Sequence, residues 1–361
     1  MLGRIELPIL IRALLPLVLL PLLSIAPRPH GLTRALLGVR QADESHAPGR
    51  AAADLARVVE HQPWRAELLE QAGIYALQGG ETQAAIEYFE RGKEQKALSP
   101  AGHLALGDAY LQIDDMDGAL GSWDAAAQGG ADPVEIFSRT LEVHLSQDDY
   151  PAVVADLREL AVLRPADVQL RYMLGLHLAA QQPQEALAHL AQAADLNPAL
   201  KPQVDILVEG IRAAQIGDDP AYTLLEAGRA LASIGEWELA AEAFQGTVEQ
   251  NPDFAEAWAY LGEARQHLDP SGDGSLSDLG LAELEKGLAL DPDSLVANTL
   301  MVLYRQRNGQ LEQALDVLER ITQSYPDNPA LQAELGNALA QTGDLGAAMD
   351  AFHAAVELSP R

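Results

Sequence analysis

Small, apolar and glycine positions recur along most of the chain at a regular spacing. A leucine or alanine followed directly by glycine appears at Ala72-Gly73, Leu106-Gly107, Leu174-Gly175, Ala227-Gly228, Leu261-Gly262 and Leu335-Gly336. About twelve residues later a small residue comes four positions before an aromatic one, as in Ala85/Phe89, Ala119/Trp123, Ala240/Phe244 and Ala348/Phe352. A proline often follows about eight residues further on, at Pro165, Pro252, Pro292, Pro326 and Pro360. Such self-similarity predicts a repeat architecture.

The pattern resembles the tetratricopeptide repeat, which has Leu-Gly in its first helix, Ala and Phe in its second, and a closing proline. On that register the repeats begin at Ala66, Pro100, Val134, Val168, Ala221, Ala255, Leu295 and Pro329. Signature positions are also filled by Tyr110, Ala126, Trp258 and Ala355. The repeats from 134 and 295 depart from the pattern, because Leu141 and Val302 replace the glycine. The resemblance covers roughly residues 51–361, where 51–63 fit the second half of a further repeat.

The resemblance implies an all-α fold, a right-handed superhelical solenoid of antiparallel helix pairs with about eight repeats and a partial one before them. Small residues let the two helices of a pair approach closely, and large ones fill the space between neighbouring pairs. One pair cannot bury its apolar face alone, so neighbouring pairs stack in register.

Two interruptions divide this array. About 20 extra residues separate the repeats from 168 and 221, and Val204, Leu207, Val208 and Ile211 within them have the spacing of an amphipathic helix. We expect an added helix packed into the solenoid, with a hinge as the alternative. The expected layout is an apolar segment over 1–26, a linker over 27–50, an array over 51–200, the extra helix over 201–220 and a second array over 221–361.

The second interruption partly mimics a calcium loop. Asp269, Ser271 and Asp273 stand at positions 1, 3 and 5 of an EF-hand, with Gly274 at position 6. Gly280 occupies position 12, where that loop needs a bidentate glutamate. The sequence therefore favours a lengthened, solvated turn.

The segment over 1–26 is mostly apolar. Arg4 and Arg12 resemble the positive start of a signal peptide, Ala13–Leu23 its apolar core, and Ser24-Ile25-Ala26 its cleavage site. Pro27 would follow the cut, which favours an uncleaved membrane anchor over a cleaved signal. A peripheral segment is a third alternative, because three prolines interrupt the stretch. The expected localisation is membrane-anchored or exported, with the helical body outside the cytoplasm.

Charge is distributed unevenly along the chain. Its 24 Lys and Arg against 53 Asp and Glu give a net charge of −29. Residues 1–50 hold six Arg and three acidic residues, so residues 51–361 hold 18 basic and 50 acidic ones, a net of −32. Such a field repels nucleic acid and favours basic partners.

The residues of known catalytic and metal motifs do not come together in this sequence. There is no cysteine, which excludes disulfides and thiolate sites. The nine histidines lack metal-ligand spacing, and the glycine pairs lack the lysine of a phosphate loop. The sequence therefore predicts no enzyme, no cofactor and no metal.

Function is expected in a groove lined by positions 2, 5, 9, 12 and 13 of the first helices. The candidate partner-binding residues are Glu67, Glu70, Asp108, Gln112, Glu135, Glu142, Tyr172, Tyr222, Arg229, Glu256, Glu263, Gln266, Arg307, Asn337 and Gln341. The Lys and Asn set with which well-known members of the family clamp a C-terminal carboxylate is absent. The acidic first part of the groove favours a basic or amine-bearing peptide, and solvated carboxylates without a ligand are the alternative.

Two functions follow from these residues. The first is a scaffold that binds partner proteins in a membrane-associated or exported complex. The second is a self-associating structural module, in which Phe352, Ala355 and Leu358 of the last helix contact another copy.

Overall fold

Helices account for all regular structure in the described part of the chain. The computed structural model describes residues 30–44, 47–269 and 278–359. The chain divides into two compact units between Val143 and His144, within one helix. The predicted segment over 1–26 and most of the calcium-like loop lie outside the described residues.

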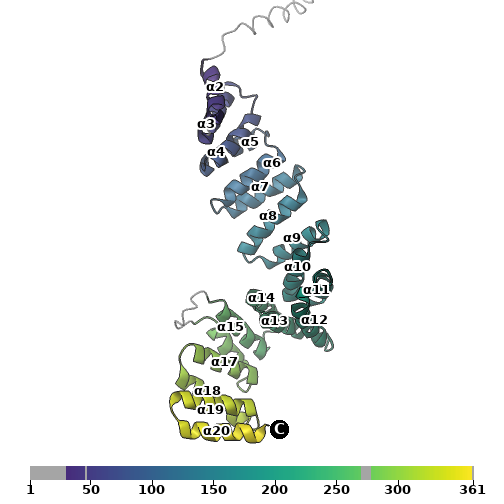
Figure 1. Ribbon diagram of the computed structural model, residues 1–361, viewed down its shortest axis with the longest axis vertical. Helices are drawn as coiled ribbons and strands as arrows, with labels where there is room; N and C mark the ends of the chain where they lie inside the picture. The colour runs from purple at the N-terminus through teal and green to yellow at the C-terminus, as the bar shows by residue number, and fades with distance from the viewer. Residues whose placement is uncertain (1–29, 45–46, 270–277, 360–361) are drawn as a thin grey trace, which may run out of the picture. The chain divides into compact units, whose positions relative to one another are not determined.

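Unit 1 consists of paired helices joined by short turns (Figure 1). Its helices are α2 (His30–Glu44), α3 (Pro48–His61), α4 (Glu67–Gln78), α5 (Thr82–Glu94), α6 (Pro100–Leu111), α7 (Met116–Gln128) and the start of α8 (Pro133–Ser146). One core cluster joins residues of four successive helices, among them Ala52, Ala76, Phe89 and Leu106. The core is therefore a chain of contacts between neighbours.

Unit 2 continues the same alternation. It contains α9 (Tyr150–Leu163), α10 (Val168–Gln181), α11 (Pro183–Leu196), the 3₁₀ turn η1 (Pro198–Leu200), α12 (Lys201–Gln215), α13 (Pro220–Ser233), α14 (Trp237–Gln250), α15 (Ala255–His267), α16 (Leu281–Leu290), α17 (Leu295–Arg307), α18 (Leu311–Ser324), α19 (Pro329–Thr342) and α20 (Leu345–Leu358). The predicted all-α solenoid of helix pairs is confirmed.

The recurring glycine of each first helix faces the aromatic residue of its own second helix. A Cβ added to the glycine would lie closer than 3.0 Å to the ring in the pairs Gly73/Phe89, Gly107/Trp123, Gly228/Phe244 and Gly336/Phe352. The two signature positions are therefore one contact, and glycine allows the ring to pack against the helix backbone.

We expect Gly228→Ala to lower the free energy of unfolding by about 1–3 kcal/mol, because the new methyl group overlaps the buried ring of Phe244. Gly121 is the matched control, since it is exposed on α7 and nothing lies within 4 Å of an added Cβ. Gly121→Ala should stabilise the fold by about 0.5–1 kcal/mol through helix propensity. Urea unfolding followed by circular dichroism measures both, and the same sign for the two variants would contradict this reading of the glycine.

The linker expected over 27–50 is wrong for most of its length, because residues 30–44 form α2 and α3 begins at Pro48. Leu32 is where an earlier repeat would begin if the register of Ala66 and Pro100 is extended backwards. Leu32 and Ala35 of α2 are buried against Leu55 and Val58 of α3. Val39 stands at the glycine position of this repeat, so the Leu-Gly signature does not mark it.

The amphipathic helix expected between the repeats from 168 and 221 is α12. Its Val204, Leu207 and Ile211 are buried, and it packs against α11 and α13. These helices belong to one compact unit. The chain divides between Val143 and His144, and not between residues 200 and 221, where a hinge was the alternative to a packed helix.

Aspartate, asparagine and serine cap many of the helices. Asp219 accepts hydrogen bonds from the backbone N–H groups of Ala221 and Tyr222, and Asn328 from those of Ala330 and Leu331. Such caps satisfy first-turn N–H groups that have no partner inside the helix. Some of the acidic residues in this chain therefore stabilise the N-terminal ends of its helices.

None of the helices in the described ranges combines the length and the hydrophobicity needed to cross a bilayer.

Candidate partner-binding face

The fifteen candidate groove residues lie on first helices of successive repeats, and we call them the first-helix face. None of them is buried. The exposed ones are Glu67, Gln112, Glu135, Glu142, Tyr222, Arg229, Glu256, Arg307, Asn337 and Gln341, and the half-buried ones are Glu70, Asp108, Tyr172, Glu263 and Gln266. The first six in chain order belong to unit 1 and the others to unit 2.

Glu70 is used inside the fold of unit 1. Its carboxylate accepts hydrogen bonds from the backbone N–H and the hydroxyl of Ser99, both at 2.7 Å. Ser99 in turn caps α6 by accepting from the N–H of Gly102. Glu70 thus holds the start of the next repeat, and no sequence pattern indicates this role because the contact joins two different repeats.

Asp108 is also paired within the protein. Arg139 of α8 donates to its two carboxylate oxygens at 2.8 and 3.3 Å, and the Trp123 indole N–H donates to the same carboxylate at 3.1 Å. The hydrogen bond with Asp108 raises the pKa of Arg139 above its usual value. Sequence reasoning missed Arg139, since only packing brings it beside the preceding first helix.

The other carboxylates of the first-helix face in unit 1 are exposed to solvent. Glu135 and Glu142 are exposed on α8, and Glu67 is exposed on α4 with Arg65 at 3.4 Å. Gln112 accepts a hydrogen bond from Thr82 at 2.9 Å. Unit 1 therefore presents three exposed carboxylates on its first-helix face.

In unit 2 the face carries aromatic rings and both signs of charge. Arg229 donates to Glu226 at 2.6 Å, and its guanidinium lies 5.4 Å from the centre of the Tyr260 ring. Burial raises the pKa of Tyr260 above its usual value. The Glu226 carboxylate is the main cause that raises the pKa of the exposed Tyr222. Neither tyrosine therefore ionises near neutral pH, and both present neutral rings.

A second group gathers around Glu263. Burial raises the pKa of this carboxyl group, and Arg307, 3.7 Å away, opposes the shift. Arg307 also donates to Gln266 at 3.3 Å. The ring of His267 stacks on Trp237 with centroids 3.6 Å apart. An ion pair and a pair of stacked rings therefore lie close together on helices α14, α15 and α17.

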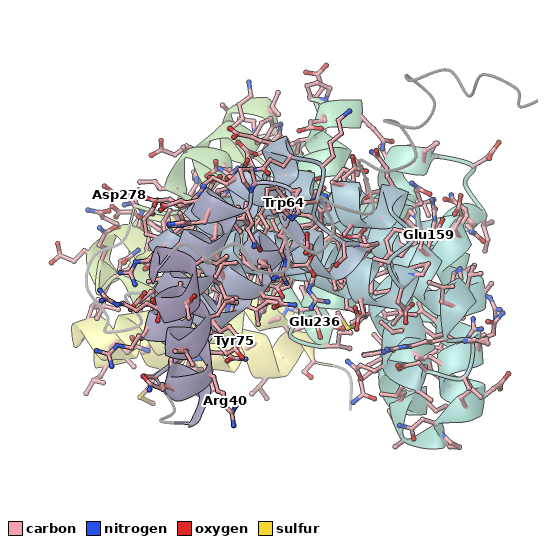
Figure 2. The ribbon with its side chains drawn as sticks, turned by 90° about the horizontal axis from the view of Figure 1, so that it is seen from above. Arg40, Trp64, Tyr75, Glu159, Glu236 and Asp278 are labelled. Carbon is pink, nitrogen blue, oxygen red and sulfur yellow. The ribbon has the colours of Figure 1, made fainter. Side chains whose placement is uncertain are left out.

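Burial raises the pKa of the Tyr172 hydroxyl, with a smaller contribution from Glu236, which is labelled in Figure 2. The last two candidates, Asn337 and Gln341, are exposed on α19.

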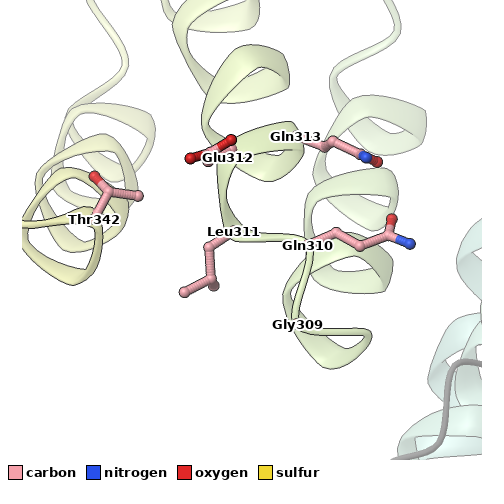
Figure 3. Close-up of a pocket in the computed structure, with 6 residues that line it drawn as sticks. All are labelled: Gly309, Gln310, Leu311, Glu312, Gln313 and Thr342. Carbon is pink, nitrogen blue, oxygen red and sulfur yellow. The ribbon is translucent and has the colours of Figure 1, made fainter.

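A pocket of about 440 Å³ lies where the turn between α17 and α18 faces the end of α19 (Figure 3). It is lined by Gly309, Gln310, Leu311, Glu312, Gln313 and Thr342. Glu312 is the one ionisable group of this lining, so the pocket offers no acid–base pair. Within the described ranges, no three His, Asp or Glu residues come together as a metal site would require.

The profile of the tetratricopeptide repeat family matches residues 71–135, 225–268 and 299–361. The first match lies in unit 1 and the other two in unit 2. Ten of the fifteen residues of the first-helix face lie within these matches.

Curated relatives match a shorter stretch. The peroxisomal targeting signal receptors of Komagataella phaffii (strain GS115 / ATCC 20864) and Komagataella pastoris are 34% identical over 119 residues, which is 31% of this chain and 19% of each receptor. The match therefore spans about a fifth of the length of these relatives.

Solved structures with similar helices share little sequence with this chain. A Naa15/Naa10 structure bound to HypK-THB is 14% identical and covers 91% of this chain and 64% of that one, with a TM-score of 0.41. A thermophilic TPR protein of Thermus thermophilus is 20% identical and covers 54% of this chain and 93% of that one, with a TM-score of 0.36.

Proposed function

We propose that this chain, which carries tetratricopeptide repeats in both of its units, is a non-catalytic scaffold that binds partner proteins through its first-helix face. The partner segment is a peptide with basic side chains, and the complex is membrane-associated or exported. The curated relatives are named as receptors for a targeting signal, which is consistent with a peptide ligand.

The observation that carries the proposal is the set of exposed carboxylates on unit 1. Glu67, Glu135 and Glu142 are exposed on first helices, while Glu70 and Asp108 are held by contacts within the fold. Exposed carboxylates on a rigid frame attract lysine and arginine side chains and speed their association. The fold thus separates carboxylates that stabilise it from carboxylates that remain open to a partner.

The test reverses these open charges. We expect Glu67→Lys, Glu135→Lys and Glu142→Lys, combined in the full chain, to weaken binding of lysine- and arginine-containing peptides by at least about tenfold at low salt. Fluorescence polarisation with a labelled peptide library gives the affinities.

A matched control removes nonspecific attraction as the cause. Glu60, Glu87 and Glu94 are exposed on the second helices α3 and α5, so Glu60→Lys, Glu87→Lys and Glu94→Lys change the net charge by the same amount. Affinity should then stay within about twofold of the unchanged chain. Equal losses in the two triple variants would refute a first-helix site.

The membrane association rests on the apolar residues 7–26 of the sequence. Full-length protein should sediment with membranes, and protease added outside intact cells should digest the helical body. Recovery of the intact chain in the soluble cytoplasmic fraction would refute this part of the proposal.

A second function is favoured by an apolar stripe on α20. Leu345, Met349 and Val356 are 66%, 61% and 72% exposed and share one face of the helix with Phe352. Phe352 itself packs against Gly336, while Ala355 and Leu358 are half-buried. Self-association would therefore use Leu345, Met349 and Val356 more than Ala355 and Leu358.

We expect a self-associating chain to become monomeric in Met349→Lys/Val356→Lys, because two buried charges oppose the apolar contact. Analytical ultracentrifugation of the full chain over a range of concentrations measures this. A concentration-independent monomer of the unchanged chain would exclude the second function.

A further inference from the structure

Arginines concentrate in a pocket between the first two described helices, α2 and α3, drawn in purple in Figure 1. The pocket has a volume of about 950 Å³, and its lining includes Arg34 of α2 and Arg50 and Arg57 of α3. None of these three belongs to the first-helix face. In a chain with more than two acidic residues for each basic one, three guanidinium groups around one pocket are unexpected.

The charges of this pocket do not cancel. Its one acidic lining residue, Asp54, is buried with 7% exposure and pairs with Arg57. Arg34 and Arg50 are exposed, and neither forms an ion pair within the described part of the chain. Two positive charges are therefore available to a ligand from opposite helices.

A neutral donor, a hydroxyl group, lies in the same lining. Thr33 of α2 contributes a hydroxyl group. His61 of α3 donates a hydrogen bond from its Nδ1 to Arg57 O at 2.9 Å, and this orients the ring so that Nε2 lies beside Gly31. The hydrogen bond to the carbonyl fixes the tautomer that carries the proton on Nδ1, so Nε2 of the neutral ring is an acceptor and Thr33 and the arginines supply the donors.

Glycine allows two side chains of α3 to lie directly against the α2 backbone in this pocket. A Cβ at Gly31 would lie closer than 3.0 Å to the His61 ring, and one at Gly38 closer than 3.0 Å to the Asp54 carboxylate. The α2 backbone therefore runs directly past these side chains.

From these contacts we propose that the pocket between α2 and α3 binds a phosphate group, held mainly by Arg34 and Arg50. A guanidinium group donates two parallel hydrogen bonds to an oxyanion, and such charge-assisted bonds are stronger than neutral ones. A single arginine satisfies a carboxylate, which has two oxygens. A terminal phosphate has three free oxygens and nearly two negative charges, and so can engage guanidinium groups from both helices.

The phosphate has two possible sources, an anionic lipid headgroup or a soluble phosphate compound. The apolar segment over 7–26 ends shortly before α2 begins at His30. If that segment enters a membrane, α2 stands at the height of the headgroups.

The experiment compares the two sources on the full chain purified in non-ionic detergent. Calorimetric titration with inorganic pyrophosphate tests the soluble source. Native mass spectrometry with phosphatidic acid, against phosphatidylcholine as the zwitterionic comparison, tests the lipid source. We expect Arg34→Gln/Arg50→Gln to bind pyrophosphate or phosphatidic acid at least about tenfold more weakly than the unchanged chain.

The control is Arg164→Gln/Arg212→Gln, which removes two exposed arginines from unit 2 and leaves the pocket intact. This variant should bind as the unchanged chain does, and helical circular dichroism should be equal in all three proteins. A loss confined to phosphatidic acid supports the lipid headgroup, and a loss with pyrophosphate supports the soluble compound. The proposal is overturned if the unchanged chain binds neither probe, or if both double variants bind equally.

Discussion

Replacing Trp123 with alanine should lower the free energy of unfolding by about 3–5 kcal/mol. The side chain extends from α7, is fully buried and packs against Gly107 of α6. Its indole N–H donates to Leu104 O at 3.3 Å and to the Asp108 carboxylate at 3.1 Å. The substitution therefore leaves a cavity in unit 1 and removes a donor from a carboxylate that also binds Arg139.

The matched control is Trp64→Ala. Trp64, labelled in Figure 2, lies in the turn between α3 and α4 and is 75% exposed, so its loss should change stability by no more than about 0.5 kcal/mol. Urea unfolding followed by far-ultraviolet circular dichroism measures both variants without relying on tryptophan fluorescence. Similar losses at the two positions would mean that the core of unit 1 does not depend on Trp123.

The second large expected effect is a loss of folding stability at acid pH, caused by His177. His177 of α10 is 8% exposed, and burial lowers its pKa from 6.5 to about 4. Within the described part of the chain its Nδ1 has no hydrogen-bond partner, and the ring lies 6.1 Å from that of Tyr150. The folded state therefore keeps this imidazole neutral at a pH where the unfolded chain already binds a proton.

Because the pKa of His177 is lower in the folded state than in the unfolded chain, acidification makes the folded state less stable. The contribution of neutral His177 is fully present above pH 6.5 and is lost as pH falls towards 4, by about 3 kcal/mol in all. Burial raises the pKa of Glu236, Glu242 and Glu263, and these groups act in the opposite direction as they take up protons.

His177→Leu isolates the histidine from these carboxyl groups. Urea unfolding at pH 6.5 and pH 4.5 should show a smaller loss of stability on acidification in the variant than in the unchanged chain. An equal loss in the two proteins would assign the acid sensitivity to other groups.

The repeat register could be predicted because it is a local, periodic property. The glycine of a first helix and the aromatic residue of its second helix have the same spacing in four repeats, and in the structure they touch. The helix over 201–215 was predicted for the same reason, since its apolar spacing appears in the chain itself.

The helix α2 was not predicted because its repeat lacks the signature glycine. Val39 replaces it, so the first described repeat keeps the 34-residue spacing but lacks the Leu-Gly signature by which the other repeats are recognised. The helix is stabilised by burial of Leu32 and Ala35 on α3, a contact that no single position indicates.

Which of the candidate site residues are open to a partner was harder to predict than the repeat register. Glu70 and Asp108 have the same sequence context as Glu135 and Glu142, that is, a carboxylate on a first helix. Contacts with Ser99 and Arg139 withdraw the first two from a partner, and these contacts depend on how neighbouring repeats pack.

By itself the sequence determined that this protein is a stack of helix pairs with a strongly acidic body, because period, turn residues and charge are all written along the chain. Only the tertiary structure decided which carboxylates are exposed, which histidine is kept neutral, and that arginines of α2 and α3 line one pocket. These three features depend on hydrogen bonds, burial and a pocket lining that involve residues distant in sequence. They therefore arise only when neighbouring helices pack.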